Sequence, residues 1–400
     1  MKVKIDVFYL VFSLLMIVLG CNQEEKRTDI VIVDFEQCLN KEQIVSISEI
    51  ADTIEYIELK TPKDIIVTRI SDVLKVDDYW IVRSLAGICK FSEDGMFIQS
   101  IGRKGQGPGE YLGIRGIDYD PKRKEVLVAD AKQILFYDLE GNYIRNVKIT
   151  EDFFYNVGIS DTVLWTTALG IHQEKYLIHA FNEKRDTLCA VPNPNYGTQV
   201  KNTDGVYFVH SRHEKEFYRY KANLYLKNRA SNDTVFRLSS SDMYPHIVFD
   251  MGKYKLPIQY EAWFSNTDYE KHASAYWGIP NVIEDDRFLF LSCQRRNGVS
   301  NNPYETSEDD WRYMIYDKES GFGFVAKEQL QDDIHGGPSV WPRFSTEEYY
   351  VGTVEWYELY PDVKAGKYSL SPELKRQFDS FNYGTNELLI IGKKRTNKKK

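Results

Sequence analysis

The sequence of 400 residues has few cysteines, no long apolar segment and no excess of positive charge. No C-x-x-C pair occurs among its five cysteines, so zinc-ribbon and dithiol redox sites receive no support. The apolar stretch at residues 7–19 is too short to anchor the chain across a bilayer. The formal net charge of −8 argues against nucleic acid as a partner.

Motifs of catalytic or phosphate-binding loops are also missing. No G-x-S-x-G occurs, and Gly158-Ile159-Ser160-Asp161 lacks the closing glycine. Ser92-Glu93-Asp94-Gly95 lacks the spacer and tryptophan of a sialidase Asp box. The glycine-rich run from Gly102 to Gly109 carries Pro108 and no Lys-Ser/Thr pair, which indicates a tight crossover between strands. We therefore predict no catalytic residue and favour a protein that is not an enzyme.

The N-terminus predicts export. Lys2 and Lys4 precede the apolar residues 7–19, which are followed by Gly20 and Cys21. Val18-Leu19-Gly20-Cys21 resembles the bacterial lipobox, so we expect residues 1–20 to be a signal peptide and Cys21 to carry the lipid. The alternative is an ordinary signal peptide with a chance cysteine.

Residues 21–50 are predicted to be a lipidated tether and lead-in. The acidic run at residues 22–25 resembles the surface-export signal of Bacteroidota lipoproteins, which implies an outer-membrane lipoprotein. Both display at the cell surface and a periplasm-facing attachment stay open. The basic tail, residues 394–400, lacks aromatic residues and is typical of a solvated end.

The body of the chain has the pattern of an all-β protein. Its 28 tyrosines and 21 phenylalanines stand mostly in short apolar runs that Gly, Asp, Asn or Pro interrupt. Residues 88–98 align without gaps on residues 134–144, and both contain an acidic residue followed by glycine between two strand-like runs. The spacing between these two aligned segments matches the length of one propeller blade.

These features predict a six-bladed β-propeller over residues 51–393. We expect its ring to close where residues 387–391 pair with residues 55–59, which removes exposed sheet edges. Ser371-Pro372-Glu373 predicts the start of one short helix that ends near Gly384. A β-sandwich or a two-domain β protein is the alternative.

Two segments carry a family resemblance. Residues 101–111, which include Gly-Pro-Gly-Glu-Tyr, and residues 232–238 resemble segments of the six-bladed β-propeller lipoproteins of Bacteroides, which are similar to NHL-type propellers. The resemblance implies the fold and a cell-envelope setting more than a function.

Candidate ligand-binding residues come from loop-like segments. Arg103, Glu110 and Tyr111 of the glycine-rich run are predicted to line a propeller face. His210 and Arg212 belong to a polar segment and are candidate ligand-binding residues. A zinc site in this segment is disfavoured, because its two histidines are three residues apart, and in a strand such residues point to opposite faces.

Tryptophans and acidic clusters give further candidates. Trp311 and Trp341 adjoin acidic or Gly/Pro-rich sequence, and Arg343 is included with them. The acidic clusters at residues 285–286, 308–310 and 332–333 have the chemistry to hold calcium or to cleave glycosidic bonds, but acidic pairs in turns are typically structural. We predict no metal and no cofactor, with calcium as the alternative.

Four cysteines lie in the predicted mature body: Cys38, Cys89, Cys189 and Cys293. Their wide spacing favours free, buried thiols, and two disulfides stay possible. Taken together, the sequence predicts a membrane-anchored binding or scaffold propeller for a glycan, a peptide or an envelope protein. The alternative is a hydrolase or lyase that cleaves polysaccharide or peptide with a carboxylate or calcium site in the propeller funnel.

Overall fold

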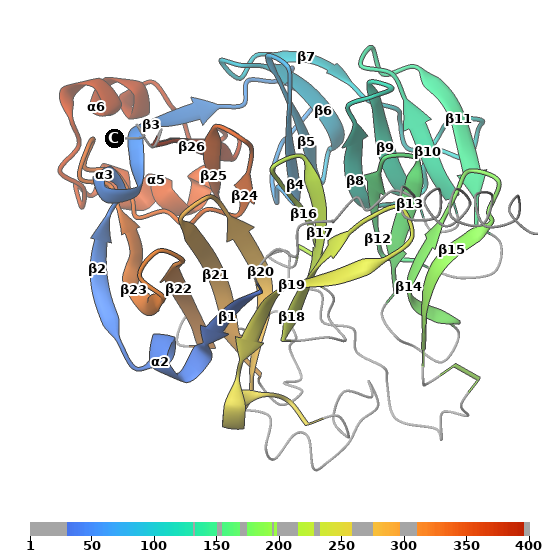
Figure 1. The fold of residues 1–400 in the computed structure, drawn as a ribbon. Helices are drawn as coiled ribbons and strands as arrows, with labels where there is room; N and C mark the ends of the chain where they lie inside the picture. Colours follow the sequence, from blue (N-terminus) through green and yellow to red (C-terminus); the bar gives the residue numbers. More distant parts are fainter. Residues whose placement is uncertain are drawn as a thin grey trace, which may run out of the picture. The chain divides into compact units, whose positions relative to one another are not determined.

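A computed structural model describes residues 30–130, 133–149, 154–168, 174–193, 196–197, 215–227, 233–257, 275–296 and 310–395. Residues from Val31 onward form one compact unit. Its strands make six sheets of four or five strands each, arranged as a six-bladed β-propeller (Figure 1). The predicted fold class is therefore confirmed.

The first three blades follow the chain in order, from the innermost to the outermost strand. They are blade 1, with β4 (Asp72–Val76), β5 (Tyr79–Ser84), β6 (Gly87–Ser92) and β7 (Phe97–Ser100); blade 2, with β8 (Ile114–Asp120), β9 (Glu125–Asp130), β10 (Gln133–Tyr137) and β11 (Tyr143–Lys148); and blade 3, with β12 (Asn156–Ser160), β13 (Val163–Thr167), β14 (Tyr176–Phe181) and β15 (Thr187–Pro192).

The last three blades each include one strand from the N-terminal segment. They are blade 4, with β16 (Phe217–Tyr220), β17 (Asn223–Lys227), β18 (Thr234–Leu238), β19 (Met243–Asp250) and β1 (Val31–Asp34); blade 5, with β20 (Trp277–Glu284), β21 (Phe288–Arg295), β22 (Trp311–Asp317), β23 (Phe322–Gln331) and β2 (Glu42–Ser46); and blade 6, with β24 (Phe344–Ser345), β25 (Tyr349–Val354), β26 (Leu388–Lys394) and β3 (Ala51–Glu58).

The ring closes through β3 and β26, as the sequence predicts. These strands are antiparallel, and Glu55 pairs with Ile391 while Glu58 pairs with Leu388. The innermost strands of successive blades contact one another from β4 through β8, β12, β16 and β20 to β24. Because the outermost strand of blade 6, β3, comes from the start of the chain, unfolding either end opens the ring.

Two parallel strands extend the outer edges of blades 4 and 5. Figure 1 shows β1 beside β19 and β2 beside β23. Short helices connect them, α2 (Phe35–Leu39) between β1 and β2 and α3 (Ile47–Ile50) between β2 and β3. The part of the predicted lead-in from residue 31 to residue 50 therefore adds two strands and two short helices to the propeller.

Most strands are buried because neighbouring blades cover both faces of each sheet. All six residues of β9 are buried, for example. Within the described residues the core divides into six apolar clusters, one between each pair of adjacent blades. This arrangement explains why the strands appear in the sequence as continuous apolar runs instead of an alternating pattern.

The predicted repeat corresponds to the outer hairpins of blades 1 and 2. Each hairpin has a β-bulge at the equivalent step, between Lys90 and Phe91 and between Phe136 and Tyr137. Its glycine has a positive φ, +86° at Gly95 and +80° at Gly141. Each glycine also packs against the outer strand of the preceding blade, so the repeated glycine is required both by the turn and by contact between blades.

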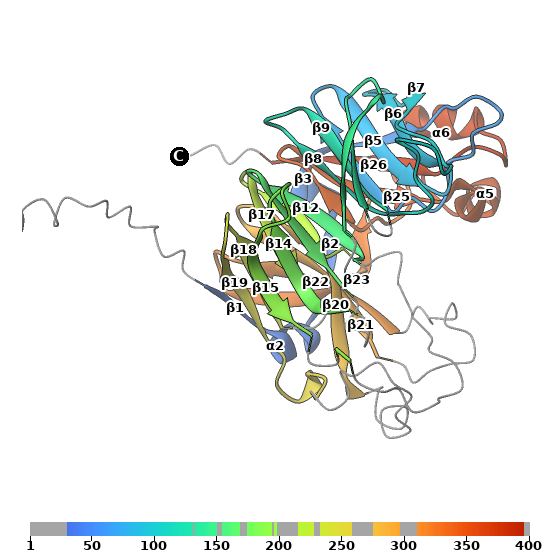
Figure 2. The same cartoon turned by 90° about the vertical axis from the view of Figure 1, so that its right-hand side faces the viewer.

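Two helices lie at the periphery of blade 6 in both ribbon views (Figures 1 and 2). They are α5 (Trp356–Lys364), which the sequence analysis does not predict, and α6 (Pro372–Asp379), which it does. Ser371 caps α6 by accepting a hydrogen bond from the Leu374 amide. A 3-10 turn, Gly252–Tyr254, follows β19. None of the helices in the described ranges is long and apolar enough to cross a membrane.

The four cysteines of the body are free thiols, as favoured by the sequence. Cys38, Cys89 and Cys293 are buried, and burial raises the pKa of the Cys38 thiol to about 12 and that of Cys89 to about 11. Cys189 is only partly buried, which differs from the prediction.

Candidate functional site

The axis of the ring is crossed by ion pairs. Asp72, the first residue of β4, accepts from Arg83 of the same blade and from Lys215, which precedes blade 4 on the other side of the ring. The ammonium of Lys215 also lies over the Phe344 ring of blade 6, 5.2 Å from its centre. One lysine therefore connects three blades at the axis.

A second bridge joins blades 2, 3 and 4. Arg219 donates to the Asp118 carboxylate at 2.7 Å and to the Ile159 carbonyl at 2.8 Å. The Ile159 amide donates to the same carboxylate. Arg219 and its partners therefore join three blades at the axis, as Lys215 does.

The pairing of Asp72 predicts acid lability. Burial acts to raise the pKa of Asp72, but the charges of Arg83 and Lys215 outweigh it, so the pKa is lowered. A carboxylate whose pKa is lower in the folded state stabilises the fold above the unfolded value, about 3.9, and loses this contribution as the pH falls through the folded value. We expect the free energy of unfolding to fall on acidification, with a smaller slope in Asp72→Asn. Urea titrations at neutral and acidic pH test this; an unchanged slope contradicts it.

A groove of about 850 Å³ lies between blades 6 and 1. Its walls come from β3, from the turns that follow β4 and β6, from the start of β25 and from the end of α6. A cavity of this size lies within the range of ligand sites. Its aromatic wall is formed by Tyr56, Tyr79, Trp80, Tyr349 and Phe381.

The polar lining of this groove is predominantly acidic. It contains Glu55, Glu58, Asp78, Glu93 and Asp94 but only one cation, Lys60. Lys60 lies 3.7 Å from Glu58, and Glu93 is paired with Lys75 at 3.1 Å. The other three carboxylates have no lysine or arginine within ion-pair distance among the described residues.

Tyr349 lies near two carboxylates of the groove, Glu55 and Glu93, and beside Glu348. Burial, together with Glu348, Glu93 and Glu55, raises the pKa of its hydroxyl. These three acids come from different parts of the chain, since Glu93 belongs to blade 1 and Glu55 to the N-terminal strand. A tyrosine ring surrounded by carboxylates attracts a cation through both the ring face and the negative potential.

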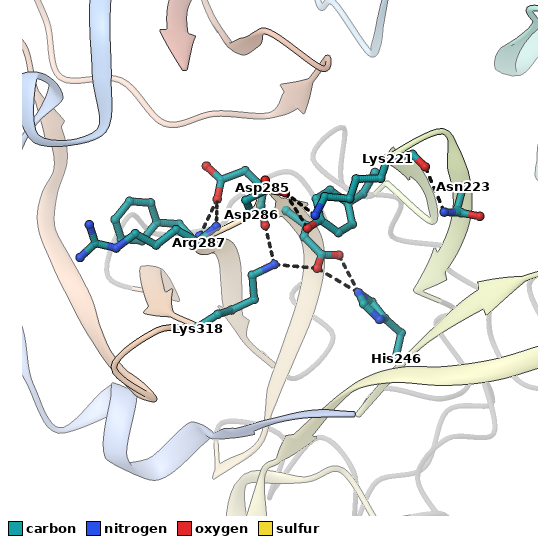
Figure 3. A network of polar contacts seen from close by, with 10 residues as sticks. Lys221, Asn223, His246, Asp285, Asp286, Arg287 and Lys318 are labelled. Atoms are coloured by element: carbon teal, nitrogen blue, oxygen red, sulfur yellow. Dashed lines mark hydrogen bonds and ion pairs between the residues drawn. The ribbon is translucent and has the colours of Figure 1, made fainter. Parts of the chain in front are cut away.

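The densest polar network lies between blades 4 and 5 (Figure 3). Glu284, whose side chain is fully buried, accepts from His246 Nε2 at 2.9 Å, from the Tyr218 hydroxyl at 2.9 Å and from Lys318 Nζ at 3.0 Å. Burial acts to raise the pKa of Glu284, but the hydrogen bond from His246 and the charge of Lys318 lower it. Burial and Glu284 raise the pKa of Tyr218. All the groups around Glu284 donate to it, so this network joins two blades.

The acidic pairs that the sequence offers for calcium or catalysis accept hydrogen bonds from turn amides and from groups on distant segments. Asp285 accepts from the amides of Arg287 and Phe288, and Asp286 accepts from Tyr220 and pairs with Lys221 (Figure 3). Asp332 accepts from four donors, among them Gly337 N and the Tyr56 hydroxyl, and Asp333 accepts from Ser48. In the part of the chain that the structure describes, no group of three metal-binding side chains occurs. Of residues 308–310, only Asp310 lies in the described part.

The glycine-rich run places its predicted residues in two environments. Arg103 is largely exposed and donates to Glu110 at 2.5 Å, while Glu110 also accepts from the Gly107 amide at 2.8 Å. These two hydrogen bonds lower the pKa of Glu110. Tyr111 is buried in the apolar cluster between blades 1 and 2.

The remaining predicted residues do not form one site. Trp341 is buried in the core between blades 5 and 6, and Trp311 is partly exposed and stacked with Tyr313. Arg343 donates to the Thr353 hydroxyl at 2.7 Å and to the Ile70 carbonyl at 3.0 Å. His210, Arg212 and Cys21 lie outside the described residues.

Sequence reasoning missed the charged residues of the axis and of the inter-blade network. Asp72 and Glu284 had a detectable signal, because each is an acid directly beside an apolar strand segment. The groove had none, since Glu55, Glu93 and Tyr349 are brought together from positions almost 300 residues apart.

The fold defines a class of protein, the six-bladed β-propellers. Within that class, the chain belongs to the family described as "Domain of unknown function (DUF4934)", whose model matches residues 30–393. No curated protein matches the chain. The lipoprotein and NHL-type character implied by the sequence resemblance stay predictions.

Two solved structures from Bacteroides are similar. BF0058 of Bacteroides fragilis NCTC 9343, a protein thought to be exported, is 16% identical with a TM-score of 0.69 and covers 92% of this chain and 100% of its own. A member of the duf4221 family from Bacteroides vulgatus ATCC 8482 is 13% identical with a TM-score of 0.52, over 86% of this chain and 97% of its own. At these identities the likeness establishes the fold.

Proposed function

We propose that this protein is a non-catalytic binding protein of the bacterial cell envelope, held to the outer membrane through lipidated Cys21. Its ligand is a cationic segment, such as a peptide rich in lysine and arginine, and the groove between blades 6 and 1 binds it. The observation that carries the proposal is the acidic lining of that groove, in which Glu55, Asp78 and Asp94 have no lysine or arginine within ion-pair distance among the described residues.

A cationic ligand fits this groove better than a glycan does. Sugar rings stack on exposed aromatic faces, but Trp80 is 1% exposed and its indole nitrogen donates to the Glu93 carbonyl at 3.2 Å. The exposed part of the lining consists mainly of carboxylates. Lys90 Nζ already lies 4.0 Å from the ring centre of Tyr79, which illustrates the cation–π contact that a ligand would make.

The test is binding of a fluorescent oligolysine peptide to wild-type protein and to Glu55→Gln/Asp78→Asn. We expect about tenfold weaker binding, since each lost charge contributes up to ~1 kcal/mol. The matched control is Asp161→Asn/Glu319→Gln, which removes the same charge from exposed sites on other blades. An equal loss in both variants, or tighter binding of neutral oligosaccharides by the wild type, contradicts the proposal.

The envelope location rests on the lipobox-like sequence around Cys21 and is tested separately. We expect wild-type protein to incorporate labelled fatty acid and to sediment with membranes, and Cys21→Ser to do neither. Protease treatment of intact cells then distinguishes surface display from a periplasm-facing attachment. Fatty acid incorporation by Cys21→Ser would refute the assignment.

A further inference from the structure

Two adjacent arginines on blade 5 have side-chain nitrogens with no acceptor among the described residues. Arg295 ends β21 and Arg296 follows it, and both are partly buried. Their Nε atoms are buried without a hydrogen bond, and no described residue forms an ion pair with either guanidinium. Six other arginines of the ring are paired with carboxylates: Arg83, Arg103, Arg123, Arg145, Arg219 and Arg287.

Both side chains lie against the start of β20, the innermost strand of the blade. The Arg295 guanidinium lies over the Trp277 ring, at 5.3 Å from its centre. Arg296 lies beside Gly278, where a Cβ atom would be 3.4 Å from its Nε and Nη2. Its backbone amide donates to the Tyr276 carbonyl at 2.8 Å. Backbone pairing and the indole ring therefore fix where these guanidinium groups stand.

An unpaired guanidinium in a partly desolvated position carries a free-energy cost that a suitable acceptor removes. Stacking on an aromatic ring uses the face of the guanidinium and leaves its edge donors available. Those donors form a planar fork that matches the paired oxygens of a carboxylate, sulfate or phosphate. Two such forks on neighbouring residues provide more donors than one oxyanion needs.

Lys215, which lies near β20, does not add a free positive charge to the two arginines. The backbone amide of Lys215 donates to the Pro280 carbonyl, two residues beyond Gly278, and its ammonium is engaged by Asp72. Lys215 is therefore already engaged, whereas no described carboxylate pairs with Arg295 or Arg296.

We propose that Arg295 and Arg296 form a binding site for an oxyanion, in the form of a sulfate, phosphate or carboxylate group. The site is on blade 5 and does not depend on the acidic groove between blades 6 and 1. Since the chain has a net charge of −8, this site would bind an anion by local hydrogen bonds against the overall field.

The experiment measures binding to the whole mature chain by calorimetry, with four probes: inorganic sulfate, inorganic phosphate, acetate and sulfated dextran. Neutral dextran is the comparison. We expect at least one oxyanion probe to bind, and about tenfold weaker binding by Arg295→Ala/Arg296→Ala. Preference for sulfated dextran over inorganic sulfate would identify an acidic saccharide as the source of the group.

Lys375→Ala/Arg376→Ala removes the same charge from an exposed helix and is expected to bind like the wild type. Arg295→Lys/Arg296→Lys keeps the charge and loses the fork, so it decides the outcome if the alanine variant does not fold. We expect it to bind several-fold more weakly than the wild type. Wild-type affinity in the lysine variant, equal losses in the alanine variant and the helix control, or no binding of any oxyanion probe would overturn the proposal.

Discussion

Alanine in place of Glu284 is expected to lower the free energy of unfolding by ~3–5 kcal/mol, the usual effect of removing one partner from a buried charged network. Glu284 accepts from Tyr218 and His246 of blade 4 and from Lys318 of blade 5. Without the carboxylate, the Lys318 charge and the Tyr218 hydroxyl lose an acceptor in a buried position. The polar contacts left between the two blades at this point would include the exposed ones that Asp286 makes with Tyr220 and Lys221.

Urea unfolding at neutral pH measures this loss. Asp286→Asn is the matched control, because Asp286 is the next acid but one along the chain, is 62% exposed and pairs with the exposed Lys221. It is expected to change stability by less than ~1 kcal/mol. Similar destabilisation of the two variants would show that Glu284 is not a special anchor between the blades.

Alanine in place of Gly95 is expected to destabilise the ring closure by about 3 kcal/mol. The positive φ of +86° accounts for ~1–2 kcal/mol of this. The new Cβ would also stand 2.2 Å from the carbonyl oxygen of Glu58, at the end of the closing strand β3, so backbone must move. Lys60 exchanges two hydrogen bonds with this hairpin, through Gly95 and Phe97, which the movement would weaken.

Gly366→Ala separates the two effects in the same measurement. Gly366 has a φ of +70°, and nothing lies within 4 Å of the position of its Cβ. Only the backbone term, about 1 kcal/mol, is expected there. If thermal or urea unfolding gives equal losses for Gly95→Ala and Gly366→Ala, the close approach between blades 1 and 6 does not contribute to stability.

The two proposed ligand sites are opposite in charge and lie on different blades. The acidic groove belongs to blades 6 and 1, whereas Arg295 and Arg296 belong to blade 5. Because their tests use probes of opposite sign, loss of one site leaves the other measurable.

The sequence by itself determined the strands, the turns and the closure of this propeller. Local physics suffices for these features: runs of apolar residues predict buried strands, and a glycine after an acidic residue predicts the hairpins at Gly95 and Gly141. The helix at Ser371 was predictable because its cap and first-turn proline act within one turn.

Only the tertiary structure decided which charged residues meet. Asp72 and Lys215 are 143 residues apart and meet because opposite blades face the axis. The parallel strands β1 and β2 escaped prediction because nothing local distinguishes a strand added to a distant blade from a linker. The same is true of the groove, whose carboxylates have no shared pattern in the sequence. Contacts of this kind depend on how sheets pack around a ring. The periodicity of a sequence indicates which residues are buried, but it does not indicate which distant residue each of them contacts.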